Sequence, residues 1–325
     1  MRRLISLLIW IAALYSGYWF AVAQTLQFGS DKAVEALAET GVDLRFGSVT
    51  TTGYPSRFET TVTDLNVGHA DWSWQGAQVV FYADSYRPLS ITLRLSRDQL
   101  LAVAGQNLRI SSEEFRSDLS LQPTPQLAFD KGQVILGATR LASDAGWQLD
   151  LGALTARLAQ SNEGAAVYDA DLTAKDLILP AILRDQIDPD AVLGADLRQI
   201  IGAAQLTLSD PLDRHLQGRP PSLDHIILHD LQIDWGPLTV ALAGAVAFDA
   251  DGIPEGQITL RTTEWQIVLD ILTRAGLINA VATNSVTLLA RFMADADGVL
   301  SLPFTFQDGI TLLGPVPVGP APRLR

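Results

Sequence analysis

The sequence predicts a mostly β protein of the α+β class, in which a few helices pack on a long, curved and mainly antiparallel sheet. An N-terminal transmembrane helix is expected before the sheet. Three observations lead to this prediction: the chain opens with an uncharged apolar run, apolar and polar residues alternate over most of its length, and helical spacing is confined to short segments.

The apolar run Leu4–Ala23 follows Arg2 and Arg3 and predicts a membrane anchor over residues 1–23. A helix rises 1.5 Å per residue, so the 20 residues of this run span about 30 Å, the thickness of a bilayer's hydrocarbon core. Because arginines stay on the cytoplasmic side, the rest of the chain is expected in a bacterial periplasm, held by one pass through the inner membrane. The aromatic residues expected to belong to the anchor are Trp10, Tyr15, Tyr18, Trp19 and Phe20.

A cleavable signal peptide is the alternative interpretation of this segment, because Ala21-Val22-Ala23 fits a small-residue cleavage site. The apolar run is longer than the usual signal core of about 7–15 residues, and bulky Trp19 and Phe20 stand close to the cleavage point. We therefore expect a retained anchor. Both interpretations export the rest of the chain.

Composition restricts the classes of partner. The formal net charge of −13 disfavours binding to nucleic acid, and the 48% of hydrophobic residues is too high for a disordered chain. Cysteine is absent, which excludes disulfides, thiolate metal sites and cysteine nucleophiles.

The clearest strand is Leu238–Phe248, and the turn Asp249–Gly252 joins it to a second strand over Gln257–Arg261. One face of the first strand is small, with Ala at most positions, and the other is bulky. A strand that is apolar or small on both faces needs two coverings, of which one could be a ligand. The bulky positions proposed to line an apolar ligand are Leu238, Val240, Leu242, Val246 and Phe248. The alternative is that other parts of the protein cover both faces of this strand.

Alternation predicts further strands at Asp43–Val49, Phe58–Val67, Gln78–Ala83, Gln133–Leu136, Ala204–Leu208 and Leu300–Phe306. Helices are expected at Ser30–Thr40, at Ile187–Ile200, from Trp265 to a stop at Gly276, and at Ser285–Ala294. The proline-rich stretch Gly314–Pro322 is expected to be an extended, polyproline-like terminus.

These elements predict an anchor over residues 1–23, a connecting helical segment over 24–41, a β-rich periplasmic domain over 42–314, and a proline-rich tail over 315–325. The β-rich domain could consist of two similar halves, because a short pattern recurs. Asp64-Leu65, Asp176-Leu177 and Asp230-Leu231 are each followed by one variable and one aliphatic residue on a predicted strand. Either a decayed repeat of one β unit or chance in a chain rich in Asp and Leu explains the recurrence.

No catalytic or metal-binding pattern emerges. His225 and His229 would share a face on a helix, but the strand expected there separates them by about 13 Å, too far for one metal ion. His69 and His215 lie in polar, turn-like contexts. No nucleophile elbow or glycine-rich phosphate loop is present. A carboxylate cluster that we expect to be a solvated face comprises Asp185, Asp188, Asp190 and Asp196. We therefore expect no enzyme, no cofactor and no metal.

Several motifs, in order along the chain, resemble an alphaproteobacterial envelope family. They are Tyr18-Trp19-Phe20, Gly53-Tyr54-Pro55-Ser56-Arg57-Phe58, Asp234-Trp235-Gly236-Pro237-Leu238, Asp251-Gly252-Ile253-Pro254-Glu255-Gly256, Ala275-Gly276-Leu277-Ile278, Asp308-Gly309 and Gly314-Pro315-Val316-Pro317. The family is that of the domain of unknown function 2125, and Ser56 departs from the aromatic residue expected at its position. The resemblance carries over no catalytic residues.

The N-terminal anchor and the β meander also resemble the broader AsmA-like group, which implies a role in outer-membrane biogenesis or in lipid movement between membranes. We therefore expect a non-enzymatic protein of envelope homeostasis that binds lipid or another apolar chain in a curved sheet. A structural scaffold that docks a periplasmic or envelope protein through a sheet edge or the tail is the alternative.

Overall fold

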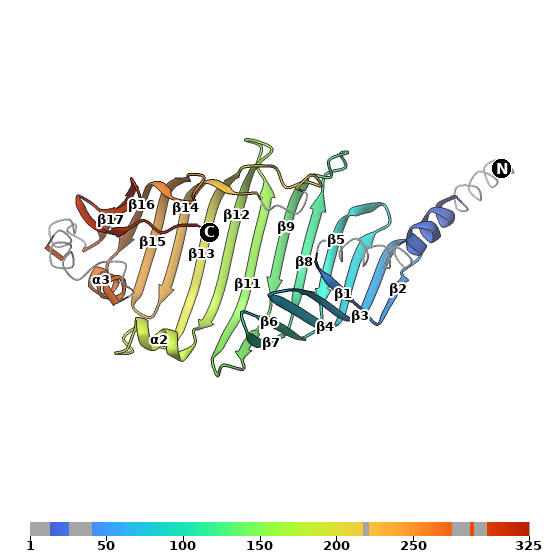
Figure 1. Ribbon diagram of the computed structural model, residues 1–325, viewed down its shortest axis with the longest axis horizontal. Helices are drawn as coiled ribbons and strands as arrows, with labels where there is room; N and C mark the ends of the chain where they lie inside the picture. Colours follow the sequence, from blue (N-terminus) through green and yellow to red (C-terminus); the bar gives the residue numbers. More distant parts are fainter. Residues whose placement is uncertain (1–13, 26–40, 217–220, 275–286, 289–297, 325) are drawn as a thin grey trace. The chain divides into compact units, whose positions relative to one another are not determined.

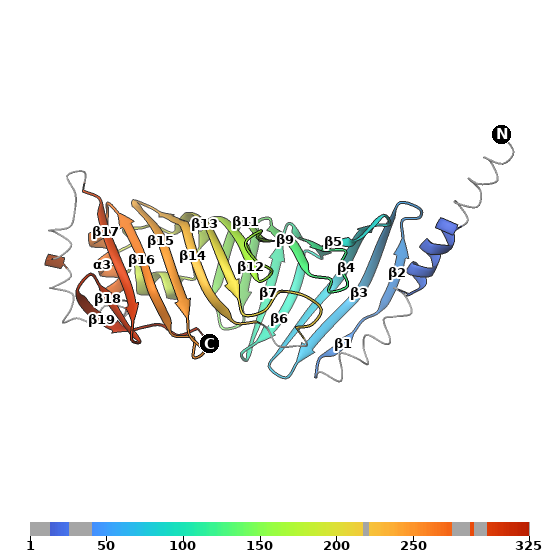
Figure 2. The same cartoon turned by 90° about the horizontal axis from the view of Figure 1, so that it is seen from above.

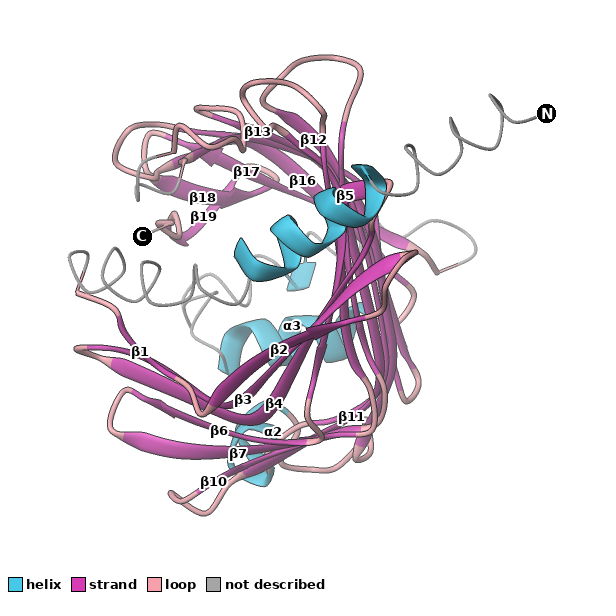
Figure 3. Cartoon of the chain, turned by 90° about the vertical axis from the view of Figure 1, so that its right-hand side faces the viewer, coloured by secondary structure: helices cyan, strands magenta, loops and turns pink. Residues whose placement is uncertain are grey.

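The computed structural model describes residues 14–25, 41–216, 221–274, 287–288 and 298–324. Strands dominate this part of the chain, and helices are few (Figures 1 and 3). The chain divides into two compact units. Unit 1 comprises Met1–Leu121 and Thr139–Gly146, and unit 2 comprises Gln122–Ala138 and Trp147–Arg325. The prediction of a mostly β protein with antiparallel strands and a few helices is confirmed.

Unit 1 is an antiparallel sheet that divides along one strand. Its strands are β1 (Asp43–Arg45), β2 (Ser48–Thr52), β3 (Arg57–His69), β4 (Trp72–Asp84), β5 (Arg87–Leu95), β6 (Asp98–Val103), β7 (Gln106–Ser112), β8 (Phe115–Leu121) and β10 (Thr139–Ser143). One edge of β4 pairs with β3. Along its other edge, the first half of β4 pairs with β6 and the second half with β5. The sheet then continues through β7 and β10 on one branch and through β8 on the other.

Unit 2 is a ten-stranded antiparallel meander (Figure 1). It comprises β9 (Phe129–Leu136), β11 (Gln148–Gln160), β12 (Val167–Ile178), β13 (Asp196–Leu208), β14 (Leu223–Trp235), β15 (Leu238–Phe248), β16 (Pro254–Thr262), β17 (Leu300–Gln307), β18 (Ile310–Leu313) and β19 (Val316–Pro320). Helices described in this unit include α2 (Ala181–Ile187) and α3 (Trp265–Arg274). Each strand pairs with its neighbour in this order, so local hairpins build nearly the whole sheet.

The register gathers the apolar residues of unit 2 on one face of the meander. On that face Ile226 of β14 lies opposite Val246 of β15 and Leu206 of β13, and Leu242 of β15 lies opposite Leu260 of β16. At the C-terminal end of the meander this face is a buried core that includes Val268 and Leu269 of α3 (Figure 2). The core residues of the strands include Leu197, Trp235, Leu238, Val240, Leu260, Leu300, Leu302 and Leu313.

The recurring Asp-Leu pattern coincides with irregular strand pairing. Asp64 and Asp176 both have positive φ angles, 50° and 53°, and the pairing of β3 and of β12 with their neighbours is interrupted at these residues without a change of register. The third copy coincides with a register shift in β14 between Leu228 and Leu231. Aspartate tolerates the left-handed conformation better than most residues, which suits Asp64 and Asp176 to these interruptions.

A glycine lies close to each of these interruptions in strand pairing. A Cβ on Gly47 would lie 3.0 Å from a carboxylate oxygen of Asp64, and a Cβ on Gly152 would lie 2.9 Å from the Cβ of Asp176. A Cβ on Gly202 would lie 3.0 Å from Leu231. The shared pattern is therefore an Asp-Leu pair at an irregularity of strand pairing, packed against a glycine of a neighbouring segment, and the sequence pattern alone does not reveal this contact.

Several predicted elements are confirmed. The strands at Phe58–Val67, Gln78–Ala83, Gln133–Leu136, Ala204–Leu208, Leu238–Phe248, Gln257–Arg261 and Leu300–Phe306 are all present, most of them longer than predicted. The helix that begins at Trp265 is α3.

The turn between β15 and β16 is also confirmed. Gly252 N–H donates to the carbonyl of Asp249 at 2.9 Å, and a carboxylate oxygen of Asp249 accepts from the amides of Asp251 and Ile253. The φ of Gly252 is +71°, the left-handed conformation expected of a glycine in such a turn.

Two predictions are wrong in their detail. The helix expected over Ile187–Ile200 ends at its first residue, because α2 covers Ala181–Ile187 and β13 begins at Asp196. The strand expected over Asp43–Val49 is broken into β1 and β2, because the chain bends at Gly47 beside Asp64, whose φ is positive. The tail is extended, as predicted, but Val316–Pro320 pairs with β18 as an edge strand and is not a free polyproline segment.

Some predictions fall outside the described residues. They are the helix at Ser30–Thr40, the stop at Gly276, the anchor residue Trp10 and the helix at Ser285–Ala294, of which only residues 287–288 are described. Among the helices that the structure does describe, none is both long enough and apolar enough to span a bilayer. The division into residues 1–23, 24–41, 42–314 and 315–325 stays a prediction.

Candidate functional site

Residues 14–25 form a helix, here called the N-terminal helix, that docks on unit 1. The hydroxyl of Tyr15 donates to the carbonyl of Pro55 at 2.7 Å and also contacts the hydroxyl of Ser85. The indole N–H of Trp19 donates to the carbonyl of Arg57 at 3.0 Å. The C-terminal half of the predicted anchor therefore contacts the turns at one end of β3 and β4.

Aromatic rings from the helix and from unit 1 pack together at this contact. Trp19 is only 4% exposed and is buried with Ala23 and Phe58. Phe20 stacks on Tyr54, with ring centroids 5.6 Å apart. The predicted anchor residues therefore differ in their surroundings: Trp19 is a packing residue, whereas Tyr18 and Phe20 are exposed.

Beside this helix unit 1 contains an apolar hollow of about 480 Å³. Among the described residues that line it, only Thr60 and Tyr82 bring a polar side-chain group, and none is charged. The lining residues are Val22, Leu44, Phe46, Val49, Phe58, Thr60, Val62, Leu65, Phe81, Tyr82, Ala83, Pro88 and Ile91. The volume falls within the range of about 300–1,000 Å³ that small-molecule sites occupy.

Strand register explains why these side chains converge. Val62 of β3 lies opposite Val49 of β2, and Phe58 of β3 lies opposite Ala83 of β4. Ala83 in turn lies opposite Ile91 of β5. Residues directly opposite in paired strands point to the same face, so one apolar stripe crosses four strands and forms the floor of the hollow. Val22 extends the lining to the N-terminal helix.

The predicted ligand-lining residues lie in unit 2, on the apolar face of the meander. Leu238 and Val240 belong to the core under α3, Val246 is buried, and Leu242 and Phe248 are half-buried. Their role as ligand lining stays a prediction. The hollow of unit 1 was not predicted, although the alternation of Phe58, Thr60 and Val62 already marks one apolar face of β3.

A second hollow, of about 760 Å³, lies where β4 divides between β5 and β6. Charged residues, which the first hollow lacks among its described lining residues, are part of its lining and include Asp64, Asp98 and Arg109. The hydroxyl of Ser111 donates to the carboxylate of Asp98, and the indole of Trp74 donates to Gln99. These are contacts between neighbouring strands, and they provide no arrangement of nucleophile and base.

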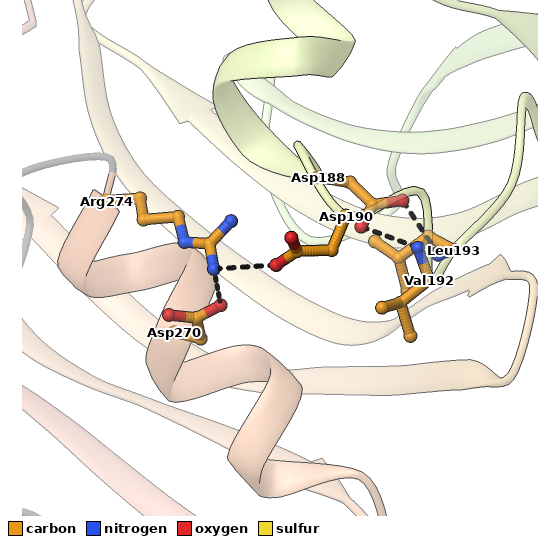
Figure 4. Close-up of polar contacts among 6 residues, drawn as sticks. All are labelled: Asp188, Asp190, Val192, Leu193, Asp270 and Arg274. Carbon is orange, nitrogen blue, oxygen red and sulfur yellow. Dashed lines mark hydrogen bonds and ion pairs between the residues drawn. The ribbon is translucent and has the colours of Figure 1, made fainter.

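The aspartates of residues 185–196 hold a loop in place (Figure 4). The carboxylate of Asp188 accepts from the amides of Val192 and Leu193 at 2.9 and 2.7 Å. Asp190 pairs with Arg274 of α3 at 3.4 Å. Elsewhere in the described ranges, no three His, Asp or Glu side chains gather as metal ligands would.

The fold and the hollow define a β-meander protein whose candidate site is a space for an apolar molecule. A family model described as an uncharacterized protein conserved in bacteria, the domain of unknown function 2125, matches residues 19–322. The chain belongs to this family. No curated protein and no solved structure matches the chain.

Proposed function

We propose that this protein is a membrane-anchored periplasmic component of the cell envelope that holds an apolar chain, such as a lipid tail, in the hollow of unit 1. The observation that carries the proposal is the chemistry of the hollow, whose described lining residues are mostly apolar and all uncharged. A charged ligand would lose its hydration there without gaining a partner, whereas an alkyl chain would be removed from water at no such cost.

The position of the hollow also supports the proposal. Val22, which belongs to the apolar run Leu4–Ala23, is part of the lining. A protein anchored through this run would carry its hollow next to the membrane, where alkyl chains are abundant. Export to the periplasm rests on the two arginines before the run and on its length. The AsmA-like resemblance is consistent with lipid handling and belongs to this proposal.

Unit 2 has an apolar surface of its own, on the face that carries the predicted lining residues. Leu172 of β12 lies opposite Gly202 of β13 on this face and is 36% exposed. Leu158 of β11 and Leu228 of β14 are half-buried there. A bound apolar molecule in unit 1 would thus occupy one of two apolar sheet faces that the protein offers.

The test is lipid retention by the full-length protein, purified in mild detergent and measured by native mass spectrometry. Phe81 lines the hollow and is 37% exposed. A carboxylate at this position stays hydrated in the empty hollow but would contact the ligand in the filled one. Phe81→Asp should therefore abolish lipid retention while the melting midpoint changes little.

Leu119→Asp is the matched control. Leu119 is also 37% exposed, and it lies opposite Ile91 on the same face of the sheet but outside the hollow. This variant should retain lipid. Equal lipid content in Phe81→Asp and the wild type, or a wild type without lipid, would refute the proposal and leave the scaffold that docks a periplasmic partner as the remaining hypothesis.

A further inference from the structure

Two turns of unit 1 lie together at the end where the N-terminal helix docks. The first is Gly53–Ser56 between β2 and β3, and the second is Ser85–Tyr86 between β4 and β5. Arg57 pairs with Asp84 in the register of β3 and β4, and Ser85 N–H donates to the carbonyl of Ser56 at 3.1 Å. We call these two segments the tyrosine turns, because each carries an exposed tyrosine.

Contacts with the N-terminal helix determine which part of the apolar run lies beside these turns. The turns bind Tyr15, Ser16 and Trp19, and Tyr15 precedes the end of the run at Ala23 by about 12 Å of helix. Tyr15, Tyr18, Trp19 and Phe20 are the residues for which the sequence predicts the membrane interface. If the run is in the membrane, the tyrosine turns lie at the same depth as these residues.

The carbonyls at the end of the first turn and at Arg57, the first residue of β3, are hydrogen-bonded within the protein, as a place with little water requires. The carbonyl of Pro55 accepts from the hydroxyls of Tyr15 and Ser85, that of Ser56 from the hydroxyl and amide of Ser85, and that of Arg57 from the indole of Trp19. Three successive carbonyls thus have partners within the protein. Irregular backbone at membrane depth is tolerated only where its polar groups are satisfied in this way.

The side chains exposed around the turns suit the headgroup region of a bilayer. Tyr86 is 70% exposed, Phe20 55% and Tyr54 49%, and the guanidinium of Arg87 lies 6.0 Å from the ring centre of Tyr86. Tyrosine and tryptophan concentrate at membrane interfaces, because the ring is apolar while the hydroxyl or indole N–H remains hydrated. Arginine next to these rings can reach lipid phosphates.

We infer that the tyrosine turns are inserted in the outer leaflet of the membrane that holds the N-terminal helix, below and up to its headgroup region, so that one end of unit 1 is embedded in the bilayer. The inference builds on the proposed anchoring and names the source of the proposed ligand. Phe58 stacks on Trp19 and also lines the hollow, so the hollow begins next to these turns. An alkyl chain from the outer leaflet would reach it without crossing bulk water.

Fluorescence quenching by lipid-attached nitroxides tests the inference on the full-length chain. The protein has no cysteine, so a single Tyr86→Cys substitution gives one labelling site for a bimane fluorophore. The labelled protein is reconstituted in phosphatidylcholine vesicles with and without lipids that carry a nitroxide on the headgroup. We expect most of the fluorescence at position 86 to be lost when the nitroxide lipid is present.

Ala70→Cys provides the matched control. It lies in the exposed turn between β3 and β4, at the opposite end of β4, about 40 Å from Tyr86 for 13 residues of strand. Bimane at position 70 should keep its fluorescence. Equal quenching at both positions, or none at position 86, would overturn the inference.

The same samples distinguish the inferred bilayer contact of the tyrosine turns from the proposed binding of an apolar ligand in the hollow. With Phe81→Asp added, quenching at position 86 should persist although lipid retention is lost. Quenching at position 86 in a protein that never retains lipid would refute the proposed function and support the bilayer contact. Lipid retention without quenching at position 86 would support the proposed function and refute the bilayer contact.

Discussion

Trp19 and Phe58 stack with their ring centroids 5.5 Å apart and their planes inclined by 16°. The pair joins the N-terminal helix to β3 and is buried together with Ala23. A tryptophan that the sequence assigns to a membrane anchor is therefore a core residue of unit 1. The same ring of Phe58 lines the apolar hollow, so packing of the helix and shape of the candidate site depend on one another.

Trp19→Ala should destabilise unit 1 by about 3 kcal/mol, because it removes a buried indole and leaves a cavity. The carbonyl of Arg57 would also lose its donor. Phe20→Ala is the control, since Phe20 is 55% exposed and its loss should cost about 1 kcal/mol or less. Thermal melting of the detergent-solubilised protein measures both variants, and equal costs would contradict the packing role of Trp19.

Gly252→Ala should destabilise unit 2 more than Gly194→Ala. Both glycines have positive φ angles, +71° and +79°, so both substitutions incur a backbone cost of roughly 1 kcal/mol. A Cβ on Gly252 would also lie 2.1 Å from the carbonyl oxygen of Leu324, whereas a Cβ on Gly194 would meet no atom within 4 Å. Chemical denaturation compares the two. If both variants unfold at the same denaturant concentration, the C-terminal residues do not pack on this turn.

The strands could be predicted because their two faces differ, as with Phe58, Thr60 and Val62 of β3, which are buried while Glu59 and Thr61 are not. The helix over Ile187–Ile200 was mistaken because Leu193, Leu197 and Ile200 recur at helical spacing. In the structure Leu193 and Leu197 belong to the core of unit 2, the first from a loop and the second from β13. Spacing alone does not distinguish a loop residue and a strand residue that share a core from two residues on one face of a helix.

The hollow could not be predicted, because it depends on contacts between residues far apart in the sequence. Val22 and Ile91 meet there only because a helix docks on the sheet and because β4 pairs with β5 along just half of its edge. A local sequence pattern does not identify which strand pairs with each half of β4.

Asp188→Ala should cost about 1–3 kcal/mol, because it leaves the buried amide of Leu193 without an acceptor. Asp190→Ala removes only an ion pair with Arg274 in which the aspartate side chain is 73% exposed, and it should cost at most about 0.5 kcal/mol. The two aspartates lie in one loop, which makes them a matched pair (Figure 4). A larger loss of stability from Asp190→Ala would refute the assigned role of Asp188.

Asp234 should make unit 2 less stable in acid. Burial alone would raise the pKa of its carboxyl, but hydrogen bonds from Gln199, Gln232 and Thr239 outweigh burial and lower it below the usual value of 3.8. A lowered pKa in the folded state stabilises the fold above the unfolded value, and this contribution is lost as the pH falls through the folded pKa. Asp234→Asn should flatten the decline in melting midpoint below about pH 4. An unchanged decline would show that other carboxylates cause it.

The left-handed backbone of Asp176 predicts a specific coupling with Gly152. Asp176 has a φ of 53°, which Asn adopts readily and Val does not, so Asp176→Asn should be nearly neutral and Asp176→Val should cost about 1–3 kcal/mol. Gly152→Ala should be destabilising as well, because its Cβ would lie 2.9 Å from the Cβ of Asp176.

Asp176→Gly removes that Cβ and keeps the left-handed backbone accessible. In this background Gly152→Ala should cost less than in the wild type, although the carbonyl of Lys175 still lies 3.2 Å from the added Cβ. A double-mutant cycle of denaturation free energies measures the difference. Strict additivity of the two substitutions would show that Asp176 and Gly152 do not pack as one unit. The shared pattern at Asp64, Asp176 and Asp230 would then have no common structural basis.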